Sequence, residues 1–310
     1  MDIQLIRTFV EVANTGSFVA ASGRLFVTQS AVSLRVQRLE DALGKTLFER
    51  SKAGAVLTPA GHAFEGYALS LLKLWEEARQ QVAVPDGFSR SLVIGGQYSL
   101  WPRLGFRWMD ALREAMPDLA LRAELGMPDR LTRFLVEGVC QTALTYMPQM
   151  RPGLTVRPVL DDELVMVASW AAPDDAHAPD VRASYVFADW GPEFQHAHAA
   201  ALPDLTTGVT LSLGALGAEY LIPRRAAAYM PARAVRRHLD AGRLHLVPNA
   251  PRFPFPAWVV LRDDIDDDLR AIALERLDHV AAQAEDAQEE VLDELARISD
   301  DGDVEVMAGP

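Results

Sequence analysis

The chain has 310 residues, of which 49% are hydrophobic and 24% are charged, and its formal net charge is −13. This length favours about two globular domains, the composition excludes a disordered or fibrous chain, and the single cysteine, Cys140, excludes a disulfide framework and a multi-cysteine metal site. The sequence contains neither a run of about 18 apolar residues, as a membrane span requires, nor a secretory signal, so we expect a cytoplasmic protein without membrane contact.

The negative charge lies almost entirely at the carboxyl end. Residues 263–310 contain three Lys and Arg against 17 Asp and Glu, whereas residues 1–60 contain seven against five. The overall charge therefore does not argue against nucleic-acid binding by the slightly basic first 60 residues.

Three short helices are predicted at the start of the chain. Apolar residues share one face of the first helix, which ends at Gly16, a residue suited to a left-handed cap. Ser17 can cap a second helix over residues 18–25, and Thr28 can cap a third that runs to about Leu43. Two short helices joined by a tight turn have the spacing of a helix-turn-helix.

The third helix has two different faces. If Val32, Val36 and Leu39 face the core, the outward face carries hydroxyls, an amide and a leucine, which suit base edges in a DNA major groove. The expected DNA-binding residues are Ser30, Ser33, Leu34, Gln37 and Arg38 in the groove, Gln29, Arg35, Arg50 and Lys52 at phosphates, and Thr28 at the helix start. The alternative interpretation is a solvent-exposed helix face.

The residues after this helix favour a two-stranded wing. Two β-type runs, 47–52 and 55–57, flank a turn at Ala53 and Gly54, and the first run supplies the two wing cations named above. A winged helix-turn-helix over residues 1–58 is the resulting prediction.

A long helix is predicted to follow the wing over residues 59–84. Thr58 can cap it, and Pro59 suits the first helical position, where its missing N–H is not needed. Apolar residues then recur at the heptad spacing of paired helices: Phe64, Ala68, Leu71, Trp75, Ala78 and Val82. We expect residues 59–85 to form a dimerisation linker, and the alternative is that this seam packs on the protein's own domains.

The remainder alternates strand-like and helical runs, which favours a mainly parallel sheet with helices on both faces. Strands are predicted over 92–96, 119–125, 141–146, 154–160, 163–168 and 185–188, with helices from a cap at Ser99 to about Met116, over 129–137 and after Asp189. The predicted domain covers 86–298, with lobe I at about 91–166 plus 263–298 and lobe II at about 167–262.

The carboxyl end is predicted to form one more amphipathic helix. Its apolar seam runs from Leu277 to Ile298, and the part beyond Glu285 either docks on the fold or mediates assembly. Residues 299–310 are acidic and weakly hydrophobic, which predicts a disordered tail.

A small-molecule site is expected where strand carboxyl ends and helix N-termini meet. Its candidate residues are Gln97, Tyr98, Ser99, Leu100, Met127, Tyr146, Trp190, Gly191 and Phe194. The aromatic rings favour a flat or apolar ligand, and the alternative is that they are core.

Other chemical motifs are weak. His196 and His198 lie two residues apart on a predicted helix, so no metal site is expected, and the glycine patterns of dinucleotide and phosphate sites are absent, so no cofactor is expected. Five arginines late in the domain are expected to form a solvated basic face, with contact to another subunit or to DNA as the alternatives: Arg224, Arg225, Arg233, Arg236 and Arg237.

Residues 1–65 resemble the winged helix-turn-helix of the LysR-type transcriptional regulators. The matching residues are Phe9, Gly16 to Phe18, Ala20, Ala21, Thr28 to Ser33, Leu39, Glu40, Leu43, Gly44, Leu47 to Arg50 and Leu57 to Gly61. Leu34, Arg35 and Ala53 depart from the family pattern, which leaves the preferred base sequence open. Within the family, the segment 28–35 and the motif 189–191 resemble the HdfR-like subgroup.

The resemblance implies a fold of the α+α/β class: an N-terminal winged helix-turn-helix, a long linker helix, and a C-terminal two-lobed α/β effector domain similar to periplasmic binding proteins. It implies a sequence-specific transcriptional regulator that binds a double-stranded DNA operator, an inverted repeat, as a homodimer or a homotetramer. A small-molecule effector of unknown identity would modulate that binding. Two other functions stay open: a small-molecule binding protein or enzyme built on the α/β lobes, and an architectural DNA binder without an effector.

Overall fold

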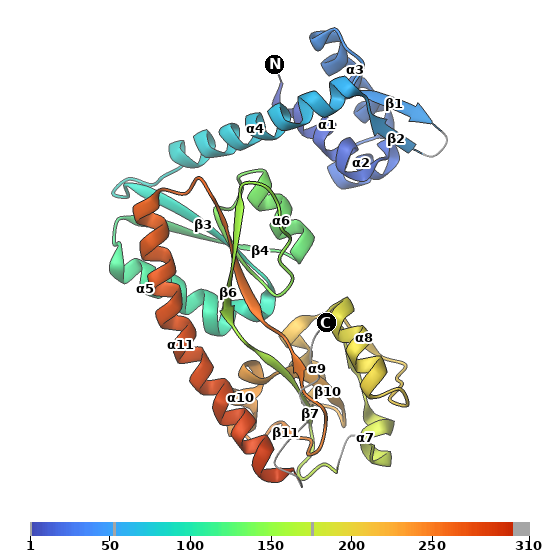
Figure 1. Cartoon of the computed structure of the whole chain (residues 1–310), viewed down its shortest axis with the longest axis vertical. Coiled ribbons are helices and arrows are strands. Elements are labelled where there is room, and N and C mark those ends of the chain that lie inside the picture. Colours follow the sequence, from blue (N-terminus) through green and yellow to red (C-terminus); the bar gives the residue numbers. More distant parts are fainter. Residues whose placement is uncertain (1, 52–53, 175–176, 300–310) are drawn as a thin grey trace. The chain divides into compact units, whose positions relative to one another are not determined.

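The computed structural model describes residues 2–51, 54–174 and 177–299, without the side chains of Arg50 and Ala287 (Figure 1). These residues divide into two compact units. The first contains the described residues up to Ser91 together with Arg133–Cys140, and the second contains Leu92–Thr132 and the described residues from Gln141 onward.

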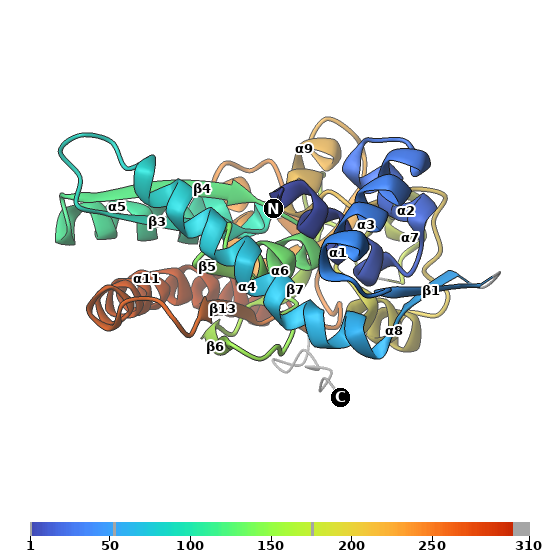
Figure 2. The ribbon, with the colours of Figure 1, turned by 90° about the horizontal axis from the view of Figure 1, so that it is seen from above.

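The first unit contains the predicted helix-turn-helix, wing and long helix. Its elements are α1 (Ile3–Thr15), α2 (Phe18–Leu25), α3 (Gln29–Leu43), β1 (Phe48–Ser51), β2 (Gly54–Leu57) and α4 (Pro59–Val82). The strands β1 and β2 pair antiparallel and project from the helices as a wing (Figure 2). The core of this unit is aromatic, since the Phe9 ring lies 5.2 Å from the rings of both Phe48 and Phe64.

The predicted helix caps are confirmed. The Ser17 hydroxyl accepts a hydrogen bond from the N–H of Ala20 at 3.3 Å, and Thr28 accepts one from Ala31 at 3.2 Å. Thr58 accepts one from the N–H of Gly61 at 3.0 Å, so that α4 starts at its proline. These contacts lie within three residues of the cap, which is why local sequence predicts them.

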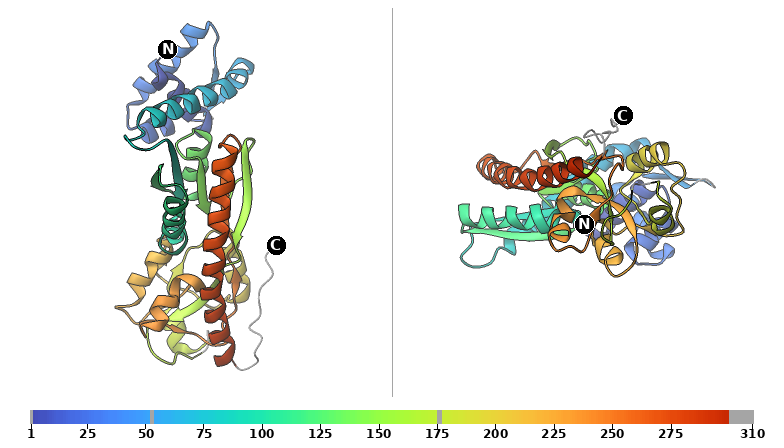
Figure 3. Two further views of the ribbon diagram at one scale, coloured as in Figure 1. Left: turned by 90° about the vertical axis from the view of Figure 1, so that its left-hand side faces the viewer. Right: turned by 90° about the horizontal axis from the view of Figure 1, so that it is seen from below.

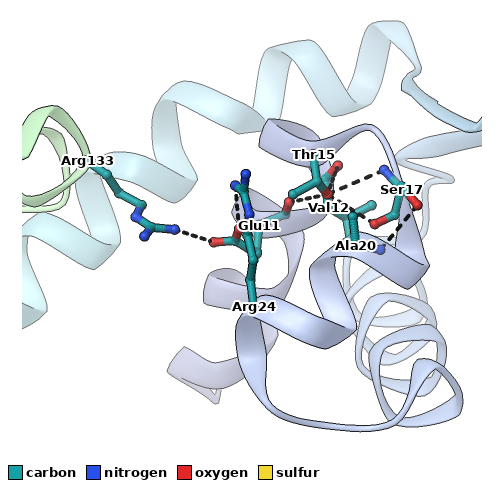
Figure 4. A network of polar contacts seen from close by, with 7 residues as sticks. All are labelled: Glu11, Val12, Thr15, Ser17, Ala20, Arg24 and Arg133. Carbon is teal, nitrogen blue, oxygen red and sulfur yellow. Dashed lines mark hydrogen bonds and ion pairs between the residues drawn. The ribbon is translucent and has the colours of Figure 1, made fainter. Parts of the chain in front are cut away.

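A buried carboxylate joins α1 to α2 (Figure 4). Glu11 is only 5% exposed, and its two oxygens accept hydrogen bonds from Nη1 of Arg24 at 3.1 Å and Nη1 of Arg133 at 3.2 Å. Next to it, the Thr15 hydroxyl donates to the carbonyl of Glu11 at 2.8 Å. The two guanidinium groups compensate the charge that burial would otherwise penalise.

The second unit is built on two larger sheets and a separate two-stranded one. One has the strand order β4 (Leu119–Leu125), β3 (Arg90–Gly96), β5 (Thr142–Thr145), β13 (Ala257–Arg262) and β6 (Leu154–Leu160). In the other, β7 (Glu163–Ala168) pairs with β10 (Ala227–Pro231), β11 (His245–Leu246) and β12 (Phe253–Pro254), while β8 (Phe187–Ala188) pairs separately with β9 (Thr210–Leu211). The helices are α5 (Phe106–Ala115), α6 (Pro128–Val136), which begins in this unit, α7 (Pro179–Ser184), α8 (Pro192–Ala201), α9 (Gly217–Leu221), α10 (Ala232–Asp240) and α11 (Asp267–Ile298).

The prediction of a mainly parallel sheet is wrong. Strands β3 and β5 are parallel, but β13 runs antiparallel to β5 and β6, and β7 is antiparallel to its three partners. The chain leaves the first sheet through β6 and returns to it through β13 after completing the second lobe. A returning strand enters in the opposite direction, which alternation along the sequence does not reveal.

The predicted helix from Ser99 is also wrong in its first part. Residues Tyr98–Leu100 form a 3-10 turn and Trp101–Gly105 a π turn before α5 begins. The Trp101 indole donates to the carbonyl of Gly96 at 3.1 Å, which pulls this segment back against β3. Ser99 does not cap the helix, because its hydroxyl accepts a hydrogen bond from the N–H of Ala215 at 2.8 Å.

The last helix docks on the second unit. Figures 1 and 3 show α11 running beside β6, and it contacts α5 and α10 as well. Beyond Glu285, Val291 and Leu295 are buried, and Arg236 of α10 lies 3.4 Å from Glu290 of α11. The extension therefore packs on the fold as far as Leu295, whereas Ile298 is exposed, and the tail beyond residue 299 is outside the described residues.

None of the helices in the described ranges combines the length and apolar character that a membrane crossing needs.

Candidate nucleic-acid interface and ligand cleft

Helix α3 presents the predicted outward face. Val32, Val36 and Leu39 are fully buried. The opposite face is at the surface, where Thr28, Gln29, Ser30, Leu34, Gln37 and Arg38 are exposed and Ser33 and Arg35 are half-buried. This orientation confirms the helical wheel, while the individual DNA contacts stay predictions.

Three of the candidate residues already have partners inside the first unit. The Arg35 guanidinium lies 3.5 Å from the Thr8 hydroxyl of α1, so the Arg35 side chain points toward α1. The hydroxyls of Thr28 and Ser30 lie 2.9 Å apart at the start of α3. Their local hydrogen bonds fix the first turn of α3, the end of a recognition helix that contacts bases.

The wing is anchored by a close backbone contact. The N–H of Ala55 donates to the carbonyl of Gly16 at 2.8 Å, and a Cβ atom on Gly54 would lie 2.5 Å from that same oxygen. Arg50 lies in β1 opposite Ala55. Lys52 falls outside the described residues, so its expected phosphate contact is a prediction from sequence.

The heptad seam of α4 divides into two parts. Phe64 and Ala68 pack on the core of the first unit, so for these residues the alternative interpretation is confirmed. Farther along the helix, Trp75 is 49% and Val82 is 88% exposed. The second half of α4 therefore carries an apolar surface that the described chain does not cover.

The two lobes of the second unit meet at a buried arginine. Arg233, at the start of α10, donates from Nε to Oδ2 of Asp162 at 2.9 Å and from Nη2 to the Tyr146 hydroxyl at 2.5 Å. The same Nη2 lies 3.4 Å from the carbonyl oxygen of Ser99. Burial raises the pKa of Tyr146, so its phenol stays protonated beside the guanidinium.

This network corrects the predicted basic face. Arg233 is 1% exposed rather than solvated, because Asp162 in the link between β6 and β7 neutralises it. Of the other arginines in that group, Arg225 pairs with Asp180 at 3.0 Å and Arg224 lies over the Tyr220 ring. Arg236 and Arg237 contact Asp240 and His238.

Several of the expected ligand residues are buried or hydrogen-bonded within the second unit. Leu100 is fully buried, and Phe194 packs among aromatic rings, as the core interpretation holds. The Gln97 side-chain oxygen accepts hydrogen bonds from the Thr145 hydroxyl at 2.7 Å and the N–H of Tyr146 at 2.8 Å. Tyr98 and Met127 are exposed.

The remaining candidates lie near the junction of the two lobes. The Tyr146 ring stacks on Phe255 with centroids 3.9 Å apart, and the Trp190 ring meets Phe255 edge-on at 5.2 Å. Gly191 has a φ of 106°, and a Cβ atom there would lie 2.8 Å from the Met147 sulfur. This positive φ therefore favours glycine, whereas the flexible Met147 side chain could move away from a Cβ atom.

A pocket of about 370 Å³ opens beside these rings. It is lined by Pro128, Asp129, Tyr146, Met147, Pro148, Gln149, Glu193, Pro256 and Trp258, so Tyr146 is the one sequence candidate in its wall. The segment 147–149 directly follows β5, and the strand-end rule would have found it had it been extended past Tyr146. The distant Trp258 carried no such signal.

His198 is a buried neutral histidine rather than a ligand. Its Nε2 lies 2.7 Å from the Tyr185 hydroxyl, and burial lowers the pKa of His198 to about 4. Burial also raises the pKa of Tyr185, so the phenol keeps its proton for this hydrogen bond. His196 is exposed, with its Nδ1 2.7 Å from the carbonyl of Pro192.

This depressed pKa predicts a pH dependence of stability. The unfolded histidine binds a proton near pH 6.5 and the folded one only near pH 4, so the free energy of unfolding should fall by about 2–3 kcal/mol as pH decreases through this window. Urea unfolding at several pH values should show a flatter profile for His198→Gln than for the wild type. His196→Gln should keep the wild-type slope, and equal slopes for all three proteins would contradict the assignment.

Comparisons with known proteins agree across both units. Residues 3–62 match the family described as bacterial regulatory helix-turn-helix protein, lysR family, and residues 85–277 match the LysR substrate binding domain. The transcriptional regulators HdfR of Yersinia pestis and Yersinia pseudotuberculosis are 32% identical over 219 residues, which cover 67% of this chain and 74% of each relative.

Solved structures share the fold. LysG of Corynebacterium glutamicum has a TM-score of 0.52 at 18% identity, covering 91% of this chain and 99% of that one. ArgP of Mycobacterium tuberculosis has a TM-score of 0.51 at 22% identity, with coverages of 91% and 98%. OxyR of Corynebacterium glutamicum has a TM-score of 0.51 at 20% identity, with coverages of 93% and 96%.

Proposed function

This chain belongs to the LysR family of bacterial transcriptional regulators, and on that premise we propose that α3 and the wing bind an inverted-repeat operator as a homodimer. The supporting observation is the surface of α3, where a row of hydroxyl, amide and guanidinium groups lies opposite a fully buried apolar face. Ser30, Gln37 and Arg38 would contact base edges. Arg50 and Lys52 of the wing segment would contact phosphates.

A titration of the operator tests this assignment. After selection of genomic fragments with the purified protein, Arg38→Ala should weaken binding of the recovered operator about 10-fold and relax its base preference, whereas Lys52→Ala should weaken all sequences alike and reduce the salt dependence. Arg113→Ala, an exposed cation of α5, is the matched charge control. Sequence-blind retention by the wild type, lost at modest salt, would instead support an architectural DNA binder.

Dimerisation is expected to use the exposed second half of α4. Trp75 belongs to the seam and is 49% exposed, and a glutamate there would place a charge in a helix–helix seam. Trp75→Glu should raise the dimer dissociation constant at least 10-fold in sedimentation equilibrium. Gln81→Glu adds the same charge to an exposed position of the same helix and should change little. An unchanged dimer in both variants would move the interface away from α4.

We place the effector in the pocket beside Tyr146 and Trp258, where the two lobes of the second unit meet. Ligand binding there would shift the relation of the two subunits and so the spacing of the recognition helices. The second unit would then sense its ligand rather than transform it. A regulator of bacterial DNA acts in the cytoplasm, which is where we expect this chain. A screen for compounds that raise the melting temperature, followed by operator titration, tests this placement.

A further inference from the structure

One aromatic side chain beside the recognition helix is almost fully exposed in the described structure. Phe26 ends α2 and is 94% exposed, although its neighbours Leu25 and Val27 both pack on the core of the first unit. The ring therefore gains none of the stabilisation that burial gives an aromatic side chain.

The backbone of Phe26 is unfavourable as well. Its φ is 52° and its ψ is 42°, in the left-handed region that costs energy for any residue with a Cβ and favours glycine or asparagine. Hydrogen bonds hold the chain there, from the N–H of Phe26 to Gly23 at 3.4 Å and from that of Val27 to Ser22 at 3.1 Å. An asparagine would fit this turn better and would expose no apolar surface.

The position of Phe26 in the chain indicates what covers the ring. Thr28, two residues later, caps α3, and the next two residues, Gln29 and Ser30, are exposed on the face proposed to bind DNA. In helix-turn-helix proteins the N-terminal end of the recognition helix contacts base edges. A ring at this corner of the molecule continues that surface, and its apolar chemistry matches the methyl group of thymine.

We propose that Phe26 is a specificity-determining residue, whose ring contacts a thymine methyl group at the edge of the operator half-site. This inference rests on the proposed DNA-binding role of α3. It explains why a phenylalanine occupies a turn that an asparagine would stabilise: the ring is buried only in the protein–DNA complex.

The test couples a protein variant to single-atom changes in DNA. Binding of the full chain is measured on the operator recovered above. Each thymine of that operator is replaced in turn by deoxyuridine, which removes only the methyl group. For the wild type, one replacement per half-site should weaken binding about 3- to 10-fold. Phe26→Asn should bind the unmodified operator about 10-fold more weakly, and that replacement should then have no further effect.

The controls separate a contact with DNA from an effect on folding or on assembly. Phe26→Asn should keep or raise the melting temperature, so weaker binding would not come from unfolding, and Phe88→Asn repeats the change at an exposed phenylalanine outside the helix-turn-helix. Additive losses from Phe26→Asn and the methyl deletions, or unchanged affinity while Arg38→Ala weakens binding, would overturn this inference alone. A changed oligomeric state of Phe26→Asn would overturn it in favour of a contact with a second copy. Failure of the wild type to select an operator would overturn the proposed function itself.

Discussion

Replacing Arg233 with methionine is expected to lower the free energy of unfolding by about 3–5 kcal/mol, because removal of one partner leaves a buried charge uncompensated. Arg233 and Asp162 are both almost fully buried, and the side chain of Arg233 also satisfies the hydroxyl of Tyr146. Methionine preserves much of the volume but donates no hydrogen bond. Urea unfolding of the full chain, monitored by tryptophan fluorescence, measures the effect.

A matched variant isolates the role of burial. Arg225→Met removes the partner of Asp180 from an ion pair whose arginine side chain is 58% exposed, and exposed pairs contribute less than about 1 kcal/mol. Similar losses for both variants would contradict the assignment of Arg233 as the centre of the lobe junction.

The Arg233→Met variant should also respond to pH. Burial raises the pKa of Asp162 while the Arg233 side chain opposes that shift, so in the variant burial is opposed only by the backbone hydrogen bonds to this carboxylate and the pKa rises further. An acid whose folded pKa is raised binds its proton more tightly when folded, which favours the folded state at low pH. The stability difference between wild type and variant should therefore shrink as pH decreases toward and below the ordinary aspartate range.

The second large effect is expected at Gly61 in the first turn of α4. A Cβ atom there would lie 2.2 Å from the carbonyl oxygen of Leu47 and 2.9 Å from Cδ2 of Leu57. The carbonyl oxygen of Leu47 cannot easily move away, because it accepts a hydrogen bond from the N–H of Thr58 at 2.9 Å. Gly61→Ala should destabilise the first unit by about 3 kcal/mol through overpacking and should weaken operator binding by displacing the wing.

A second glycine of α4, Gly66, serves as a control for which a gain in stability is expected. Apart from its chain neighbours and the backbone of its own helix, no atom of the described residues lies within 4 Å of the Cβ position on Gly66, so Gly66→Ala should stabilise the chain by about 0.5–1 kcal/mol through helix propensity alone. Thermal unfolding of both variants gives the comparison. A stabilising effect of Gly61→Ala would mean that α4 does not begin against the wing as described.

Local signals explain which elements could be predicted. The caps at Ser17, Thr28 and Thr58 depend on atoms within three residues, and the inward face of α3 follows from helical periodicity. The same reasoning left α4 ambiguous. A heptad seam predicts which side chains share a helix face. It does not predict that Phe64 packs on Phe9 while Val82 stays exposed.

The residues that line the candidate cleft are harder to predict from the sequence. Tyr146 could be placed at a strand end, but the pocket also takes Trp258 from β13, more than a hundred residues later in the chain. Ser99 was expected to cap a helix and instead contacts Ala215. In both cases the residues that come together lie more than a hundred positions apart in the chain, so the spacing of motifs in the sequence does not reveal the contact.

The family, the winged helix-turn-helix with its exposed recognition face, and the order of the main elements follow from the sequence alone, because they depend on periodicity, capping and motifs within short segments. The direction of β13, the docking of the last helix and the burial of Arg233 depend instead on the three-dimensional fold. The partners of Arg233 lie 71, 87 and 134 residues away along the chain, so an arginine that reads as solvated becomes the buried centre of the lobe junction only when the fold brings those partners together.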